Sequence, residues 1–134
     1  MAAAGATVIA GCRDTARMDT AIADNRRTTP NADIVAMRVD LADLSSIRAF
    51  AEHCTTAHAR LDILCHNAAA IMAPHSKTAD GFEMHLGTNH LGPFALTGLL
   101  FDALRAAPAA RVVSTGSLAH RLSSGLDLDD SDYA

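Results

Sequence analysis

The sequence has no tryptophan, a single tyrosine and three cysteines among its 134 residues. The cysteines form no Cys-x-x-Cys pair, which argues against a disulfide-built fold and for a reducing compartment. No apolar run reaches the about 20 residues that a membrane-spanning helix needs. The apolar start of the chain has no basic segment before it, which argues against a signal peptide. We therefore expect a cytoplasmic chain without a membrane span, and an anchor upstream of it is left open.

Charged residues form no block of one sign. The 11 basic residues are dispersed and the net charge is −4, so nucleic acid is not an expected partner. Among seven histidines, His53 with His58 and His85 with His90 are each five residues apart. Metal-binding histidines on one helix face usually lie about four residues apart. We therefore predict no metal site.

Apolar segments of two kinds alternate along the chain. Short apolar runs, often β-branched, predict strands, and longer amphipathic segments predict helices. The strands are expected at residues 6–12, 33–39, 61–65 and 111–115. The helices are expected at residues 14–27, 43–59 and 79–106. This alternation predicts an α/β fold, a doubly wound parallel sheet with helices on both faces.

Each predicted helix has its own signals. Asp14 is a plausible N-cap for the first helix, and Asp43 or Leu44 opens the second. The third, 79–106, has apolar residues on more than one face, which indicates that it is enclosed or shared with another subunit. The second helix has a stripe of apolar residues, which predicts its buried face. These residues are Ile47, Phe50, Ala51 and Cys54.

The segment LDILCHNAAA, which contains the predicted strand 61–65, ends in a polar residue followed by alanines. Ligands of open parallel sheets bind beyond the carboxyl ends of the strands. Small side chains there allow a backbone or a flat ligand to approach closely. His66, Asn67, Ala68 and Ala69 therefore lie where a ligand is expected.

Five segments carry a family resemblance and occur in this order: AGATVIAGCRD, VDLADLSSIRAFAE, LDILCHNAAAIM, KTADGFEMHLGTNHLGPFALT and ARVVSTGSLAH. Together they resemble the short-chain dehydrogenase/reductase family, in its retinol dehydrogenase-like branch. The resemblance implies an incomplete Rossmann-like domain, with residues 1–134 as its middle portion. It also implies an NADP(H)-dependent oxidoreductase acting on a small, lipophilic carbonyl or alcohol.

The resemblance assigns cofactor contacts to the first half of the chain. Arg13 matches the position that meets the ribose 2′-phosphate, and a guanidinium pairs well with phosphate. NADP is therefore expected over NAD, although the acidic Asp14 follows immediately. Asp40 and Leu41 match the pair that flanks the adenine ring. Without the resemblance, the preferred interpretation of Asp40 is that it starts the next turn.

Asn67, Ala68 and Ala69 match the family's Asn-Ala-Gly motif, with alanine in place of the usual glycine. The methyl group of Ala69 can crowd the cofactor or disfavour a positive φ angle. An alternative role for Asn67 is to tie neighbouring strands together through its side-chain amide.

Asn89 and Ser117 match two catalytic positions of the family. Asn89 would distort the long helix and hold a water of the proton relay, and Ser117 would hydrogen-bond the substrate carbonyl. Asparagine is unfavourable inside a helix, and Gly92-Pro93 weakens the helix further. A helix kink without chemistry is the alternative interpretation.

Two parts of the family pattern are not found in this sequence. No glycine-rich turn precedes the first predicted strand, since Gly5 and Gly11 are wrongly spaced for it. Tyr133 follows Ser117 by sixteen residues, but no lysine stands four residues after it to complete a Tyr-x-x-x-Lys pair. We therefore expect no catalysis by this chain alone. The alternative function is a non-catalytic nucleotide-binding or dimerisation module, pairing through helix 79–106.

Overall fold

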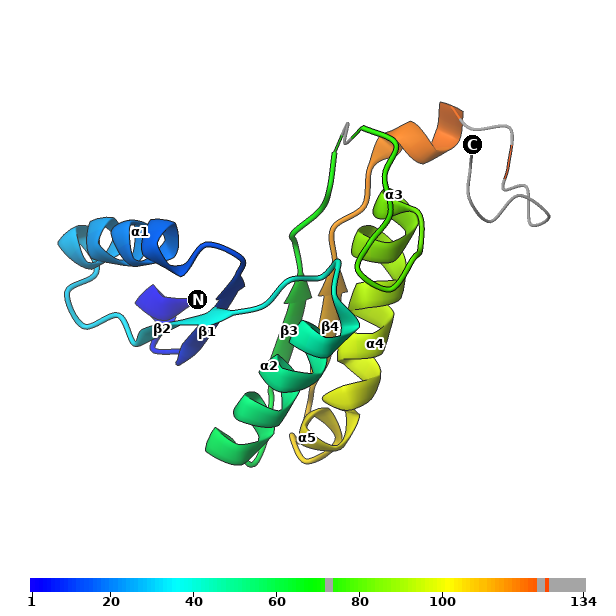
Figure 1. The fold of residues 1–134 in the computed structure, drawn as a ribbon. Helices are drawn as coiled ribbons and strands as arrows, with labels where there is room; N and C mark the ends of the chain where they lie inside the picture. The colour runs from blue at the N-terminus through cyan, green and yellow to red at the C-terminus, as the bar shows by residue number, and fades with distance from the viewer. Residues whose placement is uncertain (72–73, 123–124, 126–134) are drawn as a thin grey trace. The chain divides into compact units, whose positions relative to one another are not determined.

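The computed structural model describes residues 1–71, 74–122 and 125 (Figure 1). The chain divides into two compact units, Met1–Asp40 and Leu41–Ala134. Each unit contains one pair of parallel strands and at least one helix that follows a strand in the chain. The α/β fold class is therefore confirmed, and the four strands pair two by two.

The first unit consists of a short 3-10 helix (Ala2–Ala4), β1 (Val8–Cys12), α1 (Thr15–Thr28) and β2 (Ile34–Arg38). β1 and β2 are parallel, with Val8 opposite Ile34. Asp14 is the N-cap of α1, as predicted, and its carboxylate accepts a hydrogen bond from the Arg17 backbone N–H at 2.9 Å. Such a cap satisfies a backbone donor that has no partner within the helix. Ile22 is the buried residue of this helix.

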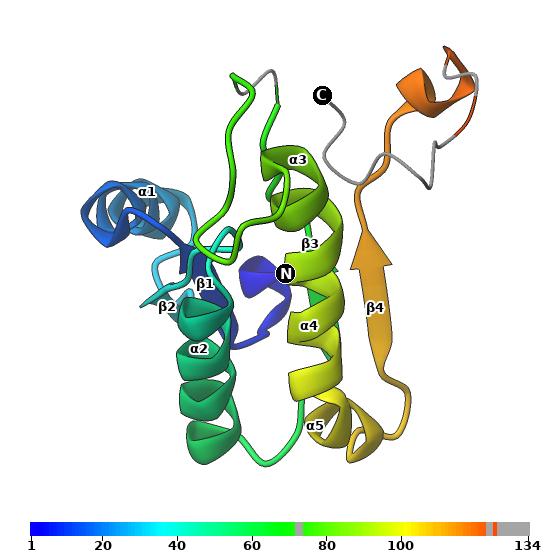
Figure 2. The ribbon, with the colours of Figure 1, turned by 45° about the vertical axis from the view of Figure 1, so that its right-hand side comes forward.

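The second unit begins with α2 (Leu44–Ala57), continues with β3 (Ile63–His66) and ends its sheet with β4 (Arg111–Ser114), which is parallel to β3. Asp43 caps α2 by accepting hydrogen bonds from the backbones of Ser45 and Ser46. The whole predicted stripe of α2 is buried, and α2 packs beside α4 (Figures 1 and 2).

The predicted long helix over 79–106 is wrong in its start and its continuity. The structure has α3 (Met84–Leu86), a π-helical turn (Gly87–Leu91), α4 (Gly92–Leu99) and α5 (Phe101–Arg105). The start is late because Gly81, at φ 87°, turns the chain, and because Glu83 is the N-cap. At Leu100, φ −94° and ψ 3° interrupt the helix before α5.

The segment that contains α4 and α5 buries one face and exposes the other. The buried residues of this segment include Leu96, Leu100 and Leu104, while Phe94 and Phe101 are 74% and 54% exposed. The apolar surface of this helix led to two alternative predictions, enclosure within the chain or sharing with another subunit. Enclosure within the chain is wrong, because the side chains of Phe94 and Phe101 are exposed. In the part of the chain that the structure describes, no helix has the length and apolar character to cross a membrane.

Gly92 provides a test of how tightly α2 and α4 are joined. A Cβ added there would lie 2.5 Å from the Leu41 carbonyl oxygen and 3.3 Å from Ile47 Cδ1. We expect Gly92→Ala to lower the free energy of unfolding by about 1–3 kcal/mol, as overpacking does. Gly98→Ala is the matched control, because nothing lies within 4 Å of its added Cβ. It should stabilise the chain by up to about 1 kcal/mol. Urea unfolding of both variants measures the difference, and equal effects would contradict the packing described.

Candidate functional site

The loop that follows β3 contains the predicted ligand-facing residues. Asn67, Ala68 and Ala69 are exposed in this loop. The Thr115 hydroxyl donates a hydrogen bond to Asn67 Oδ1 at 3.3 Å, and the Thr115 backbone N–H donates to the His66 carbonyl at 2.9 Å. The predicted alternative role of Asn67, tying neighbouring strands together, is thereby confirmed. The loops after β3 and β4 are held together at the carboxyl ends of their strands.

Asn89 lies in the π-helical turn and binds the same loop from the other side. Its Oδ1 accepts a hydrogen bond from the Ala70 backbone N–H at 2.7 Å. Its Nδ2 donates to the Ala70 carbonyl at 2.9 Å. Both hydrogen-bonding groups of the Ala70 backbone are thus paired with one side chain. The predicted distortion of the helix at Asn89 is confirmed, and the side-chain amide serves a structural purpose there.

The backbone carbonyl of Asn89 lacks the donor that a regular α-helix would give it. In a regular α-helix the donor to that carbonyl would be the N–H of residue 93, four positions later. Residue 93 is proline, which has no N–H. Turns of π type commonly occur at functional sites for such reasons. The carbonyl of Asn89 can therefore accept a hydrogen bond from a water or a ligand.

Ser117 follows β4 and precedes a 3-10 helix at Leu118–Leu122. Its backbone carbonyl accepts hydrogen bonds from the His120 backbone N–H at 3.3 Å and from His120 Nδ1 at 2.6 Å. Ser117 is exposed. The structure thus brings Asn89 and Ser117 into one unit, connected through the loops that contain Asn67 and Thr115.

His66 anchors the end of β3 on α4, a contact that sequence reasoning missed. Its Nε2 lies 2.8 Å from Thr97 Oγ1, and the Thr97 hydroxyl donates to the Pro93 carbonyl at 2.8 Å. Because a hydroxyl has one proton to donate, His66 Nε2–H is the donor in their hydrogen bond. Burial lowers the pKa of His66, which favours the neutral ring, and in the neutral ring this bond selects the tautomer protonated on Nε2.

The carboxylate of Glu83, which is buried, starts the helix that contains Asn89. It accepts hydrogen bonds from the Leu86 backbone N–H at 2.7 Å and from His85 Nδ1 at 2.8 Å. Burial alone would raise the pKa of Glu83. Hydrogen bonds from the backbone of His85 and Leu86, together with the His85 ring, outweigh burial and lower that pKa to about 2.

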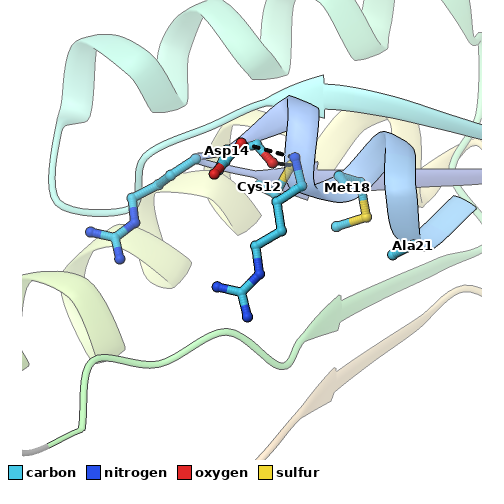
Figure 3. A pocket seen from close by; sticks show the side chains of 6 residues that line it. Cys12, Asp14, Met18 and Ala21 are labelled. Atoms are coloured by element: carbon cyan, nitrogen blue, oxygen red, sulfur yellow. Dashed lines mark hydrogen bonds between the residues drawn. The ribbon is translucent and has the colours of Figure 1, made fainter.

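A separate pocket lies in the first unit, where β1 ends and α1 begins (Figure 3). Its volume is about 300 Å³, and both of its arginines, Arg13 and Arg17, are exposed. Arg17 was missed by sequence reasoning, although its position four residues after Arg13 was a usable signal. The pocket is lined by Cys12, Arg13, Asp14, Arg17, Met18 and Ala21.

The acidic residue in this pocket already accepts a hydrogen bond from the protein backbone. Asp14 accepts from the Arg17 backbone N–H in its role as helix cap. Burial, followed by the charges of Asp14 and Asp19, raises the pKa of the Cys12 thiol, so this cysteine is the neutral thiol at neutral pH. The two guanidinium groups fit a phosphate, which each can bind through charge-assisted hydrogen bonds.

The remaining predicted positions are placed as follows. Asp40 and Leu41 follow β2 and are both half-buried; Asp40 ends the first unit and Leu41 begins the second. Tyr133 lies outside the described residues. Within residues 1–71, 74–122 and 125, no three His, Cys, Asp or Glu side chains are grouped as a metal site requires.

Known proteins resemble this chain over most of its length. The family model for short chain dehydrogenase matches residues 1–125. Human retinol dehydrogenase 12 is 46% identical over 122 residues, 91% of this chain and 39% of that relative. Human retinol dehydrogenase 13 is 43% identical over 130 residues, 97% of this chain and 39% of that relative. The chain therefore spans about two fifths of the length of these relatives.

Solved structures resemble this chain as well. A structure titled Pseudomonas aeruginosa RhlG/NADP active-site complex aligns with a TM-score of 0.68 and 33% identity. The alignment covers 92% of this chain and 49% of that one. The arrangement of strands and helices in the two chains is therefore alike.

The pKa of Glu83 predicts how stability depends on pH. Because the pKa falls from an ordinary 4.5 to about 2 in the folded chain, the unfolded chain binds this proton at higher pH than the folded one. The stabilisation from ionised Glu83 is present above about pH 4.5 and should be lost as pH falls toward 2. We expect Glu83→Gln to flatten the fall in unfolding free energy between pH 5 and 2.

Urea unfolding across that pH range measures this effect. Glu52→Gln is the matched control, because Glu52 is exposed on α2, and it should keep the wild-type pH profile. An unchanged slope in Glu83→Gln would show that the carboxylate does not cap the helix in solution.

Proposed function

Because the chain belongs to the short-chain dehydrogenase family, we propose that it forms part of an NADP(H)-dependent oxidoreductase acting on a carbonyl or alcohol. The observation that carries the proposal is the pair of hydrogen bonds between Asn89 and Ala70. Ala70 lies in the loop after β3, and Ser117 follows the neighbouring strand β4. Similarity to two retinol dehydrogenases over more than 90% of the chain supports a lipophilic substrate.

The pocket at Arg13 and Arg17 supports NADP(H) over NAD(H). Two exposed guanidinium groups there can bind the 2′-phosphate, while an acidic residue would be needed to accept the free 2′-hydroxyl of NAD. Asp14 does not fill that role, since its carboxylate caps α1. The structural neighbour from Pseudomonas aeruginosa is titled as an NADP complex. We assign the adenine ring to Asp40 and Leu41, and close backbone approach to Asn67, Ala68 and Ala69.

When bound, the nicotinamide cofactor supplies or accepts the hydride of such a reaction. The family's general acid, a tyrosine with a lysine four residues later, is not found in this sequence. The residues of this chain do the part of the work described next. The Ser117 hydroxyl donates a hydrogen bond to the substrate oxygen and so polarises the carbonyl. The Asn89 backbone carbonyl holds a water through which a proton reaches or leaves the site. Asn89 also fixes Ala70 and thereby the loop on which substrate and cofactor meet.

A second candidate function is a non-catalytic module that binds a nucleotide or dimerises. The exposed apolar side chains of α4 and α5 favour it: Phe94 (74% exposed), Leu99 (45%) and Phe101 (54%). Side chains of this size are common in the centres of protein interfaces. We propose homo-oligomerisation through this face for either function. Turnover of a carbonyl substrate with bound NADPH, by a longer chain that supplies a glycine-rich turn and a Tyr-x-x-x-Lys pair, would favour the enzyme. NADPH binding or dimerisation without turnover in that longer chain would favour the module.

We propose the cytoplasm as the compartment. Cys12, Cys54 and Cys65 are thiols rather than disulfides. Thiols persist in reducing compartments.

The cofactor assignment predicts a selective loss of phosphate binding. Arg13→Ala and Arg17→Ala should each weaken NADPH binding about tenfold, because a hydrogen bond to a charged group is worth about 1.5–3 kcal/mol. The affinity for NADH should stay within about twofold, since it has no 2′-phosphate. Calorimetry with NADPH, NADH and adenosine 2′,5′-bisphosphate measures each affinity.

Arg48→Ala is the control, because Arg48 is exposed on α2 outside the pocket. It should leave all three affinities unchanged. NADH bound as tightly as NADPH by the wild-type chain, or equal losses for both cofactors in Arg13→Ala, would overturn the assignment to the 2′-phosphate.

A further inference from the structure

Residues 76–84 form a small hairpin just before the helix that contains Asn89. The Thr78 backbone N–H donates to the Phe82 carbonyl at 2.8 Å, and the Met84 N–H donates to the Ser76 carbonyl at 3.0 Å. Gly81 supplies the turn with φ 87°, a conformation that glycine adopts without steric cost. We refer to residues 76–84 as the clasp.

One side of the clasp binds the start of α2. Asp80 Oδ2 accepts a hydrogen bond from the Leu44 backbone N–H at 2.8 Å. The Ala79 N–H donates to the Ala42 carbonyl at 3.0 Å. These two bonds hold the backbone immediately after Leu41, the residue to which the proposed function assigns the adenine ring.

The other side of the clasp contacts the π-helical turn. The Thr78 side chain, which is buried, occupies the space that a Cβ on Gly87 would need. The Glu83 carbonyl accepts a hydrogen bond from the Gly87 N–H at 2.8 Å. The clasp thus contacts the first residue of the turn that contains Asn89. Interiors packed this closely transmit small displacements instead of absorbing them.

Asp80 bonds the first backbone donor of α2, Leu44 N–H, whereas the N-cap Asp43 bonds the two donors after it. Asp43 accepts from the backbones of Ser45 and Ser46 at 2.8 and 3.2 Å. The bond from Leu44 to Asp80 therefore adds a connection between two segments 36 residues apart in the chain. A charged acceptor makes this bond stronger than a neutral one would be.

We propose that Asp80 is a positioning residue that couples the Leu41 segment to the turn of Asn89, so that cofactor binding on the adenine side and geometry at the reacting side depend on each other. The assignment of Leu41 to adenine rests on the proposed function. The mechanical coupling rests on the contacts of the clasp alone. Removing the Asp80 acceptor leaves the Ala79–Ala42 bond as the remaining one of the two bonds between the clasp and the start of α2, which weakens the connection and loosens the Asn89–Ala70 pair.

Hydrogen exchange of the ligand-free chain tests the coupling directly. In Asp80→Ala, the Ala70 amide, which is bonded to Asn89 Oδ1 at 2.7 Å, should exchange at least about fivefold faster than in the wild type. The His58 amide, bonded to the Cys54 carbonyl at the far end of α2, should be unchanged, which separates positioning from general destabilisation. Asp80→Asn retains an acceptor oxygen without the charge and should give a rate at Ala70 between those of the wild type and Asp80→Ala.

Asp102→Ala is the matched control, because Asp102 is exposed on α5 away from the clasp, and it should leave the Ala70 rate unchanged. Equal exchange at Ala70 in the wild type and Asp80→Ala would overturn the coupling. So would a parallel rise at Ala70 and His58.

Nucleotide binding tests the functional half separately. Asp80→Ala should weaken binding of adenosine 2′,5′-bisphosphate about tenfold, and Asp80→Asn should weaken it by less, because it keeps an acceptor oxygen without the charge. A wild-type chain that does not bind this nucleotide counts against the proposed function, while the exchange rates still decide the coupling. A folded Asp80→Ala variant that binds as tightly as the wild type overturns the link between Asp80 and the adenine side.

Discussion

The two hydrogen bonds between the Asn89 side chain and the Ala70 backbone are the constraint on which the candidate site depends. These bonds are 2.7 and 2.9 Å long and join the loop after β3 to the helix that contains Asn89. The helix accommodates them by opening into a π turn over Gly87–Leu91. Proline at position 93 then removes the α-helical donor that would otherwise occupy the Asn89 carbonyl. The Asn89 side chain therefore fixes the loop, and Pro93 changes the hydrogen bonding of the Asn89 carbonyl at the same place.

Contacts around that turn fix the helix before it and connect the loops after β3 and β4. Asn67 binds Thr115, which joins the loop to the segment that carries Ser117. Glu83 caps the helix just before the turn, and Gly92 lets the Leu41 segment approach closely. The proposed function requires a substrate-polarising hydroxyl and a proton path at the carboxyl ends of β3 and β4, and Asn67 and Thr115 follow those two strands directly. Their arrangement explains why polar residues interrupt an otherwise apolar helix.

Local signals predicted much of this molecule, and the errors come from contacts between distant residues. The spacing of α2 predicted its buried stripe because a helix shows its packed face every three to four residues. The N-caps Asp14 and Asp43 followed from neighbouring residues. The start of the third helix was misplaced because Gly81 turns the chain and Glu83 caps the helix after it. The bond from Leu44 to Asp80, which anchors that turn, joins residues 36 apart and is not revealed by a local pattern. The role of Arg17 could have been anticipated from its spacing to Arg13. The hydrogen bond between His66 and Thr97 could not be anticipated, because the two residues are 31 positions apart in the chain.

The most direct test of the account is the crystal structure of an Asn89→Leu variant. Leucine has nearly the same size and favours helix, but it cannot bond the Ala70 backbone. The account predicts that the loop after β3 moves away from the helix and that the π turn closes toward regular α-helix, while β3 and β4 keep their pairing. A variant that retains both the π turn and the position of Ala70 would contradict the claim that this side chain organises the site.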